Sequence, residues 1–448
     1  MRLFVAVAAS TLAVSAGSLV TFNKDVLPIL QKNCQGCHRP GEAAPMSFVT
    51  YQEARPWAKS IREAVLLKRM PPWFADPAHG KWANDRSLSQ AEIDTLTAWS
   101  DGGAPEGNAK DRPALLEFPE GWNIGKPDVV IEMPNEFAVP PSGTIEYQYV
   151  VIPTGFTEDK WVRMAEVRPG NRALVHHVIA FIRPPGSKWL QEAKPGIVFV
   201  PQRRRQEAQP ANAQQPANSA QQSQERRRSE GEGSGEFLVG FAPGSMPEVL
   251  KPHQGKLIKA GSDIVFQMHY TSNGKAGTDQ TRVGLILSSQ AATERVLTIA
   301  AQNNKFVIPA NAGSHRVDAE LEIQHDTTLT AFLPHMHLRG KSFEYRVAFP
   351  NGESQVLLSV PKYSFNWQLS YYLEKPLLLP KGTKIQCTAH FDNSANNPDN
   401  PDPSSEVRWG DQSWEEMMIG FMDVVLDAKT DPSVLFRRQQ RPAATGSN

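Results

Sequence analysis

The run Ala173-Leu174-Val175-His176-His177-Val178-Ile179 is an apolar, strand-like segment that carries two adjacent imidazoles. A polar group buried without a partner costs free energy, so two histidines in such a run need partners. A second apolar run, Ile264 to Tyr270, contains His269, which alone would be a hydrogen-bonded core histidine. Neighbouring residues of a regular strand face opposite sides, so a bulge or twist must turn His176 and His177 towards one ion.

A third run, His335-Met336-His337, has metal-ligand spacing. Residues i and i+2 of a strand face the same side, so its two imidazoles lie next to each other. Further along, Glu416-Met417 adds a thioether. Taken singly, Met417 is core packing, but two histidines with one methionine form a soft ligand set that favours copper(I) over zinc or iron.

Near the N-terminus, Cys34-Gln35-Gly36-Cys37-His38 is a C-x-x-C-H motif. Two thiols one helical turn apart can form thioethers to one porphyrin, while the adjacent imidazole reaches its iron. The alternatives are a zinc half-site or a redox disulfide, but zinc would need a second pair of ligands. Residues Phe22 to Pro105 are similar to bacterial class I cytochrome c domains, which implies electron transfer.

The sixth haem ligand must come from elsewhere in the chain. Met70 precedes Pro71-Pro72-Trp73 just after a predicted helix, where a loop can bring its thioether to iron. Histidine and methionine ligation raises the haem potential. Met46 and His79 remain rivals.

Composition limits the fold and the partners. With 36 Pro and 31 Gly, the chain beyond about residue 126 predicts short strands and turns, whereas capping residues such as Ser89 with Glu92 predict helices before it. Lys+Arg and Asp+Glu both number 47 in the 448 residues, so no net charge attracts nucleic acid. The apolar stretch after Arg2 is typical of a signal peptide and is short for a membrane span. We therefore expect a periplasmic or secreted bacterial protein with no transmembrane span once mature.

The order of the histidine clusters resembles that of the copper type II, ascorbate-dependent monooxygenases, the family of peptidylglycine α-hydroxylating and dopamine β-monooxygenases. The resemblance covers about Lys126 to Ala428. It implies a histidine-only copper that transfers electrons and a copper that binds oxygen. Their ligands would be His176, His177 and His269 for the first, and His335, His337 and Met417 for the second.

The resemblance also implies fold and chemistry: two antiparallel, jelly-roll-like β-sandwich domains that face each other across a solvent cleft, following a small all-α cytochrome c domain. The expected reaction hydroxylates a C-H bond of a small substrate with O2. Electrons would come from ascorbate, another reductant or an electron-donor protein, and the haem is a candidate relay for them. Peptide-amidating members hold a carboxylate with Arg and Tyr where this chain has Leu333 and Phe421. A non-enzymatic electron-transfer or copper-handling protein, or a cytochrome-linked dehydrogenase, is the alternative.

The predicted division of the chain follows these patterns. It consists of a signal peptide at 1–16, a cytochrome c domain at 17–110, a linker at 111–125, copper domains at 126–300 and 301–430, and a tail at 431–448. A disordered insertion is expected at 201–235, where Gln, Ala, Pro, Ser and Arg dominate.

Overall fold

A computed structural model describes residues 19–42, 44–118, 121–201 and 235–436. The predicted signal peptide, the predicted insertion except its two end residues, and residues 437–448 of the predicted tail lie outside them. The described residues form two compact units. A helical unit comprises the chain up to Pro72 together with Arg86–Glu117, and a β unit comprises Trp73–Asp85 and the chain from Phe118 onward.

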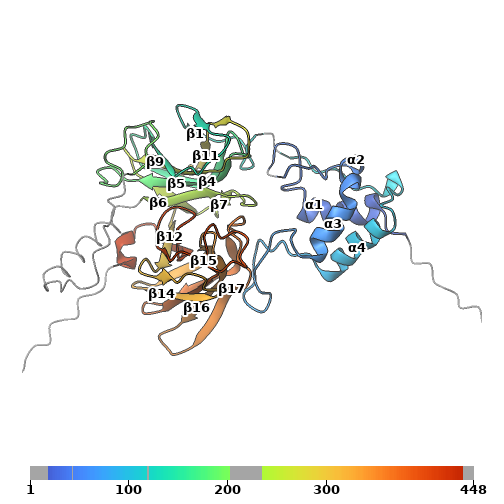
Figure 1. The fold of residues 1–448 in the computed structure, drawn as a ribbon. Coiled ribbons are helices and arrows are strands. Elements are labelled where there is room, and N and C mark those ends of the chain that lie inside the picture. The colour runs from blue at the N-terminus through green and yellow to red at the C-terminus, as the bar shows by residue number, and fades with distance from the viewer. Residues whose placement is uncertain (1–18, 43, 119–120, 202–234, 437–448) are drawn as a thin grey trace, which may run out of the picture. The chain divides into compact units, whose positions relative to one another are not determined.

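The helical unit contains the predicted helices (Figure 1). They are η1 (Phe22–Val26), α1 (Leu27–Asn33), α2 (Tyr51–Ala54), η2 (Arg55–Trp57), α3 (Ala58–Leu66), α4 (Gln90–Asp101) and η3 (Ala109–Asp111). The predicted capping box of α4 is confirmed, because Ser89 and Glu92 each bond the other's backbone N–H. Buried Leu30, Leu96 and Trp99 form the core of this unit.

The segment Trp73–Asp85 belongs to the β unit, although the sequence pattern placed it within the cytochrome domain. Its aromatic residues are partly buried against the core of that unit: the Trp73 ring lies 4.9 Å from that of Tyr371, and Trp82 forms a β-bridge with Leu373. The backbone N–H of Asp76 also donates to the Ser359 carbonyl. Apolar burial therefore ties this segment to the β unit and divides the helical unit's sequence in two.

Three main sheets build the β unit. The nine-stranded sheet runs β1 (Val129–Glu132), β11 (Arg282–Leu287), β4 (Lys160–Arg168), β8 (Gln254–Ile258), β12 (Glu294–Gln302), β21 (Ile419–Asp427), β15 (Thr327–His335) and β18 (Tyr371–Leu379), with β7 (Glu248–Val249) on β4. A four-stranded sheet runs β3 (Gln148–Pro153), β9 (Asp263–Tyr270), β5 (Val175–Arg183) and β6 (Glu236–Phe241). The third runs β14 (His315–Glu322), β19 (Lys384–Phe391), β16 (Gly340–Ala348) and β17 (Ser354–Val360).

Smaller elements complete the β unit. They are the pairs β2 (Phe137–Val139) with β10 (Gly277–Asp279) and β13 (Val307–Ile308) with β20 (Val407–Arg408), and the 3-10 helix η4 (Pro432–Leu435). The strand pairings are antiparallel except for β8 with β12. The chain is thus a short helical region followed by mostly antiparallel β-sheet structure, which confirms the coarse fold expectation.

Two large apolar cores lie in the β unit. One joins β3, β5 and β9 to β4 and β11, and the other joins β12, β15 and β21 to β14, β16 and β19. The predicted domain boundary at residue 300 falls inside β12, which pairs with β21 from Glu294 to Gln302. Because β12 also pairs with β8, one continuous sheet connects both cores.

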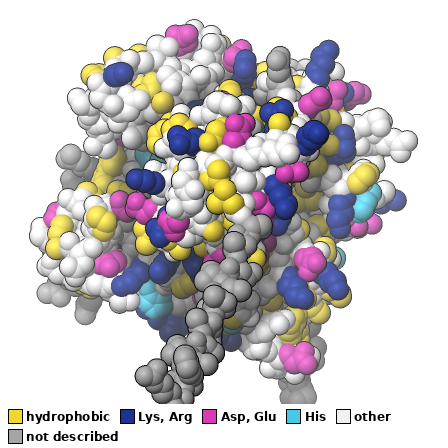
Figure 2. Space-filling model, turned by 90° about the vertical axis from the view of Figure 1, so that its right-hand side faces the viewer, with side chains coloured by type: hydrophobic (Ala, Val, Ile, Leu, Met, Phe, Trp, Pro, Cys, Tyr) yellow, Lys and Arg dark blue, Asp and Glu magenta, His cyan; other side chains and the backbone are white. Residues whose placement is uncertain are grey.

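The surface of the chain agrees with its balanced charge. On the face shown in Figure 2, basic and acidic side chains of the described residues are interspersed. No described helix is long and apolar enough to cross a membrane.

Candidate metal centres

The first centre lies where β5 pairs with β9. Val175 is opposite Tyr270 and His177 is opposite His269, so the register shifts by one residue at His176. This irregularity is the predicted bulge, and it turns both adjacent histidines to the same side. The candidate ligand atoms of His176, His177 and His269 all lie within 4.8 Å of one another.

The Nδ1 atoms of the three rings lie next to one another. Nδ1 of His177 lies 3.1 Å from Nδ1 of His176 and 3.3 Å from Nδ1 of His269. One ring proton cannot satisfy both contacts, so unshared lone pairs are turned towards one point. The far nitrogens face oxygens, at 3.3 Å from His176 Nε2 to Asn366 Oδ1 and 3.5 Å from His269 Nε2 to Ser413 Oγ. Donation from Nε2 to these oxygens would leave Nδ1 free to bind a cation.

Burial keeps these imidazoles neutral. The side chains of His177 and His269 are buried. Burial lowers the pKa of His269 to about 3 and that of His177 well below its ordinary value, and neighbouring imidazoles lower both further. Burial also lowers the pKa of His176. Neutral imidazole is the form that binds metal, so this cluster can hold a metal ion.

The second predicted centre lies at the end of β15. His335 pairs with Ile419 of β21, and the rings of His335 and His337 have centroids 5.2 Å apart, as the i, i+2 spacing predicts. Met417 lies two residues before Ile419, next to fully buried Met418. The register therefore brings the segment of Met417 alongside that of His337.

Hydrogen bonds fix which nitrogen each ring offers in this second centre. His335 Nδ1 lies 2.8 Å from Gln368 Oε1, and His337 Nδ1 lies 3.2 Å from the Glu415 carbonyl oxygen. Both partners are acceptors, so each Nδ1 carries the proton and each Nε2 keeps its lone pair. His337 Nε2 is buried and has no hydrogen-bond partner among the described residues. Burial lowers the pKa of His335 to about 4.

Glu416, which the sequence patterns did not single out, holds this centre together. Its carboxylate accepts from the backbone N–H of His337 at 2.8 Å and from that of Arg339 at 2.6 Å. Glu416 is fully buried, and burial raises its pKa to about 8. It therefore joins the segment before Met417 to the turn that carries His337.

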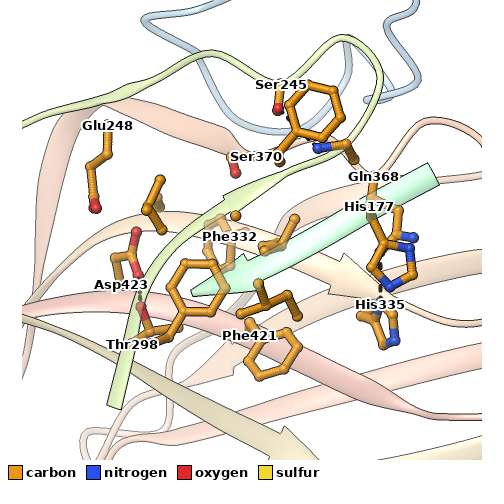
Figure 3. Close-up of a pocket in the computed structure, with 18 of the residues that line it drawn as sticks. His177, Ser245, Glu248, Thr298, Phe332, His335, Gln368, Ser370, Phe421 and Asp423 are labelled. Atoms are coloured by element: carbon orange, nitrogen blue, oxygen red, sulfur yellow. Dashed lines mark hydrogen bonds between the residues drawn. The ribbon is translucent and has the colours of Figure 1, made fainter. Parts of the chain in front are cut away.

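The two centres lie close to each other. The ring of Phe365 is 4.8 Å from that of His176 and 5.8 Å from that of His337. A cavity of about 80 Å³ remains, lined by His177 and His335 among others (Figure 3). The loop around Phe365 therefore packs across the first centre and also reaches the second.

In the helical unit, the C-x-x-C-H residues form one tight turn. The backbone N–H groups of Cys37 and His38 both donate to the Cys34 carbonyl, and no disulfide joins the two thiols. The His38 ring stacks on Phe48 at 4.3 Å, and its Nδ1 lies 3.3 Å from the Met46 carbonyl oxygen. His38 Nε2 is thereby left as the nitrogen for a ligand, which suits the predicted haem.

The candidates for the sixth haem ligand are separated by the division into units. Met70 lies in the helical unit just after α3, where its backbone N–H contacts the Ala64 carbonyl. Met46 packs against the helical core, whereas His79 belongs to the β unit. Met70 remains the predicted ligand.

Comparison with known proteins identifies no family and only weak structural similarities. No family model and no characterised protein matches the chain. Among solved structures, it is similar to T=1 particles derived from infectious bursal virus, with TM-score 0.19 and 8% identity over 69% of this chain and 72% of that chain. It is also similar to allantoicase, with TM-score 0.16 and 8% identity over 57% of this chain and 79% of that chain. TM-scores this low support no conclusion about fold or function.

Proposed function

We propose that this protein is an exported copper-dependent monooxygenase that hydroxylates a C-H bond of a small substrate. It resembles the copper type II, ascorbate-dependent monooxygenases in the order of its ligand residues. The observation that carries the proposal is the pair of buried histidine centres whose ligand nitrogens are freed by outer hydrogen bonds. A purely structural role would leave the converging lone pairs of His176, His177 and His269 without an explanation.

The two centres would have different roles in the reaction. His176, His177 and His269 would hold the copper that stores and passes an electron, while His335, His337 and Met417 would hold the copper where oxygen reacts. Bound copper would supply the redox chemistry by which one oxygen atom enters the C-H bond and the other leaves as water, using two electrons and two protons. Gln368 and Glu416 orient the second set, and Phe365 excludes water between the two sets.

The helical unit would be a cytochrome c domain. Cys34 and Cys37 would form thioethers to one c-type haem, with His38 Nε2 and Met70 as axial ligands. The turn geometry and the bond from His38 Nδ1 to a carbonyl support this assignment. The haem would relay electrons from ascorbate, another reductant or an electron-donor protein to the first copper.

The expected metal content tests this proposal. Exported protein should carry one covalent haem and two coppers, and copper-loaded, reduced protein should consume O2 as a C-H substrate is hydroxylated. Elemental analysis and oxygen uptake measure both, with His325→Ala at an exposed histidine as the control variant. One zinc and no copper would refute the proposal. Two coppers without hydroxylation would favour a copper-handling or electron-transfer protein.

A further inference from the structure

The cavity beside the second centre has two chemically different ends. His177, His335 and Gln368 line one end, and Glu248, Thr298 and Asp423 line the other (Figure 3). Phe237, Leu333 and Phe421 are among the apolar residues that also line it. Met246 lines it too and is 54% exposed, which places an opening at the connection between β6 and β7.

Strand register explains why Asp423 faces the cavity. Asp423 is opposite Thr298 of β12, and Phe421, two residues earlier on β21, is opposite Leu333 of β15. Alternate residues share a face, so the carboxylate and these apolar side chains lie on one surface. His335 stands two residues beyond Leu333 on the same face.

The acidic end keeps one negative charge in excess. Lys256 Nζ lies 2.8 Å from Glu248 Oε2 and also interacts electrostatically with Asp423, and Arg295 Nη2 lies 2.6 Å from Glu236 Oε2, so three carboxylates share two cations. Asp423 Oδ1 accepts from the neutral Thr298 hydroxyl at 2.6 Å. A group of three carboxylates with only two cations, beside an apolar wall, favours a further cationic partner.

We propose that this cavity is the substrate site and that its substrate is a short aliphatic primary amine. The ammonium group would bind Asp423, and the alkyl chain would run along Phe421 and Leu333 towards His335. The volume of about 80 Å³ is about half that of a cavity that holds benzene, which selects a chain of a few carbons over an aromatic ring. This inference rests on the proposed function for the reaction, but not for the binding.

Calorimetric titration of the full chain tests the inference without copper turnover. n-Butylammonium should bind at least about 10-fold more tightly than n-butanol, since hydrogen bonds to charged groups are the stronger ones, and butyrate should not bind. 2-Phenylethylammonium should bind more weakly than n-butylammonium. Equal affinity for the ammonium ion and the alcohol would overturn the charge argument, and tighter binding of the aromatic amine would overturn the size argument.

Two aspartate variants test whether Asp423 binds the ammonium group. Asp423→Asn should weaken n-butylammonium binding roughly 10- to 100-fold and leave n-butanol unchanged, whereas Asp427→Asn, at an exposed position of the same strand, should change neither. An unchanged affinity in folded Asp423→Asn would refute the assignment. If that variant does not fold, the ligand series on the unaltered chain still decides. If the protein holds two coppers but does not bind n-butylammonium, the substrate class is wrong and the proposed function stands. If it binds n-butylammonium but holds no copper, the proposed function is wrong and the binding site stands.

Discussion

The two histidine centres differ in which imidazole nitrogen points towards the candidate metal position. In the first, the Nδ1 atoms of three rings face one another, and Nε2 atoms face Asn366 and Ser413. In the second, Nδ1 atoms face oxygens and Nε2 atoms are turned inward. The first set sits within paired strands, whereas the second sits at a strand end and in turns.

This difference teaches how the same residue type can serve two purposes. Ladder hydrogen bonds on both sides of the bulge hold His176, His177 and His269, so the first centre resists rearrangement. The second depends on the Glu416 carboxylate, and His335 lines the cavity. A rigid centre suits electron transfer, and a centre at a cavity suits reaction with substrate.

The largest expected effect comes from His177→Ala. His177 Nδ1 contacts both other rings, so its loss should empty the first centre and reduce the copper content from two to one. Copper(I) competition with a chelator measures both sites. His325→Ala, at an exposed histidine, is the control. Retention of two coppers with unchanged affinities would contradict the assignment of the first centre.

A smaller effect is expected from Met417→Ile, which removes a thioether but no imidazole. Copper affinity of the second centre should fall by at least roughly 10- to 100-fold, the range for residues that only support a ligand, and oxygen uptake should fall to background. The first copper should stay. The same titration and an oxygen electrode test this. Loss of both coppers together would show that the two centres are not separate sites.

Sequence reasoning could predict how the candidate ligands are arranged because that arrangement follows local rules. The adjacent histidines required a bulge, and the structure has one at His176. The i, i+2 spacing placed His335 beside His337. Both predictions use only the geometry of a single strand.

The supporting residues could not be found in this way. Gln368 is 33 residues from His335, and Asn366 is 190 residues from His176. Such contacts depend on how distant loops pack, and a lone Gln or Asn in a loop gives no signal. The β-unit location of Trp73–Asp85 was missed for the same reason, since its burial requires Tyr371.

The smallest expected effect separates the centres by pH in metal-free protein. The pKa of His269 is about 3 in the folded protein, below the ordinary value of 6.5. As the pH falls, the imidazole is therefore protonated in the unfolded chain before it is protonated in the folded protein. Its stabilising contribution is complete above pH 6.5 and is lost as the pH falls towards 3. Glu416 has the opposite sign. Its pKa of about 8 lies above the ordinary 4.5, so its contribution is complete below pH 4.5 and is lost as the pH rises towards 8.

Two variants, His269→Gln and Glu416→Gln, test this difference in sign through the free energy of unfolding. Each of these two groups should contribute a slope of about 1 kcal/mol per pH unit to the free energy of unfolding, with opposite signs, and the other buried histidines add to the loss on the acid side. His269→Gln should remove part of the stability loss that occurs as the pH falls below 6.5 and should leave the slope above pH 6.5 unchanged. Glu416→Gln should remove a stability loss of opposite sign, the one that occurs as the pH rises, over the whole range from pH 5 to 8. Denaturant unfolding of chelator-treated protein between pH 5 and 8 gives both slopes, with His325→Gln as the control. If both variants changed the slope of stability against pH with the same sign, the contrast between a rigid strand centre and a carboxylate-held centre would be wrong.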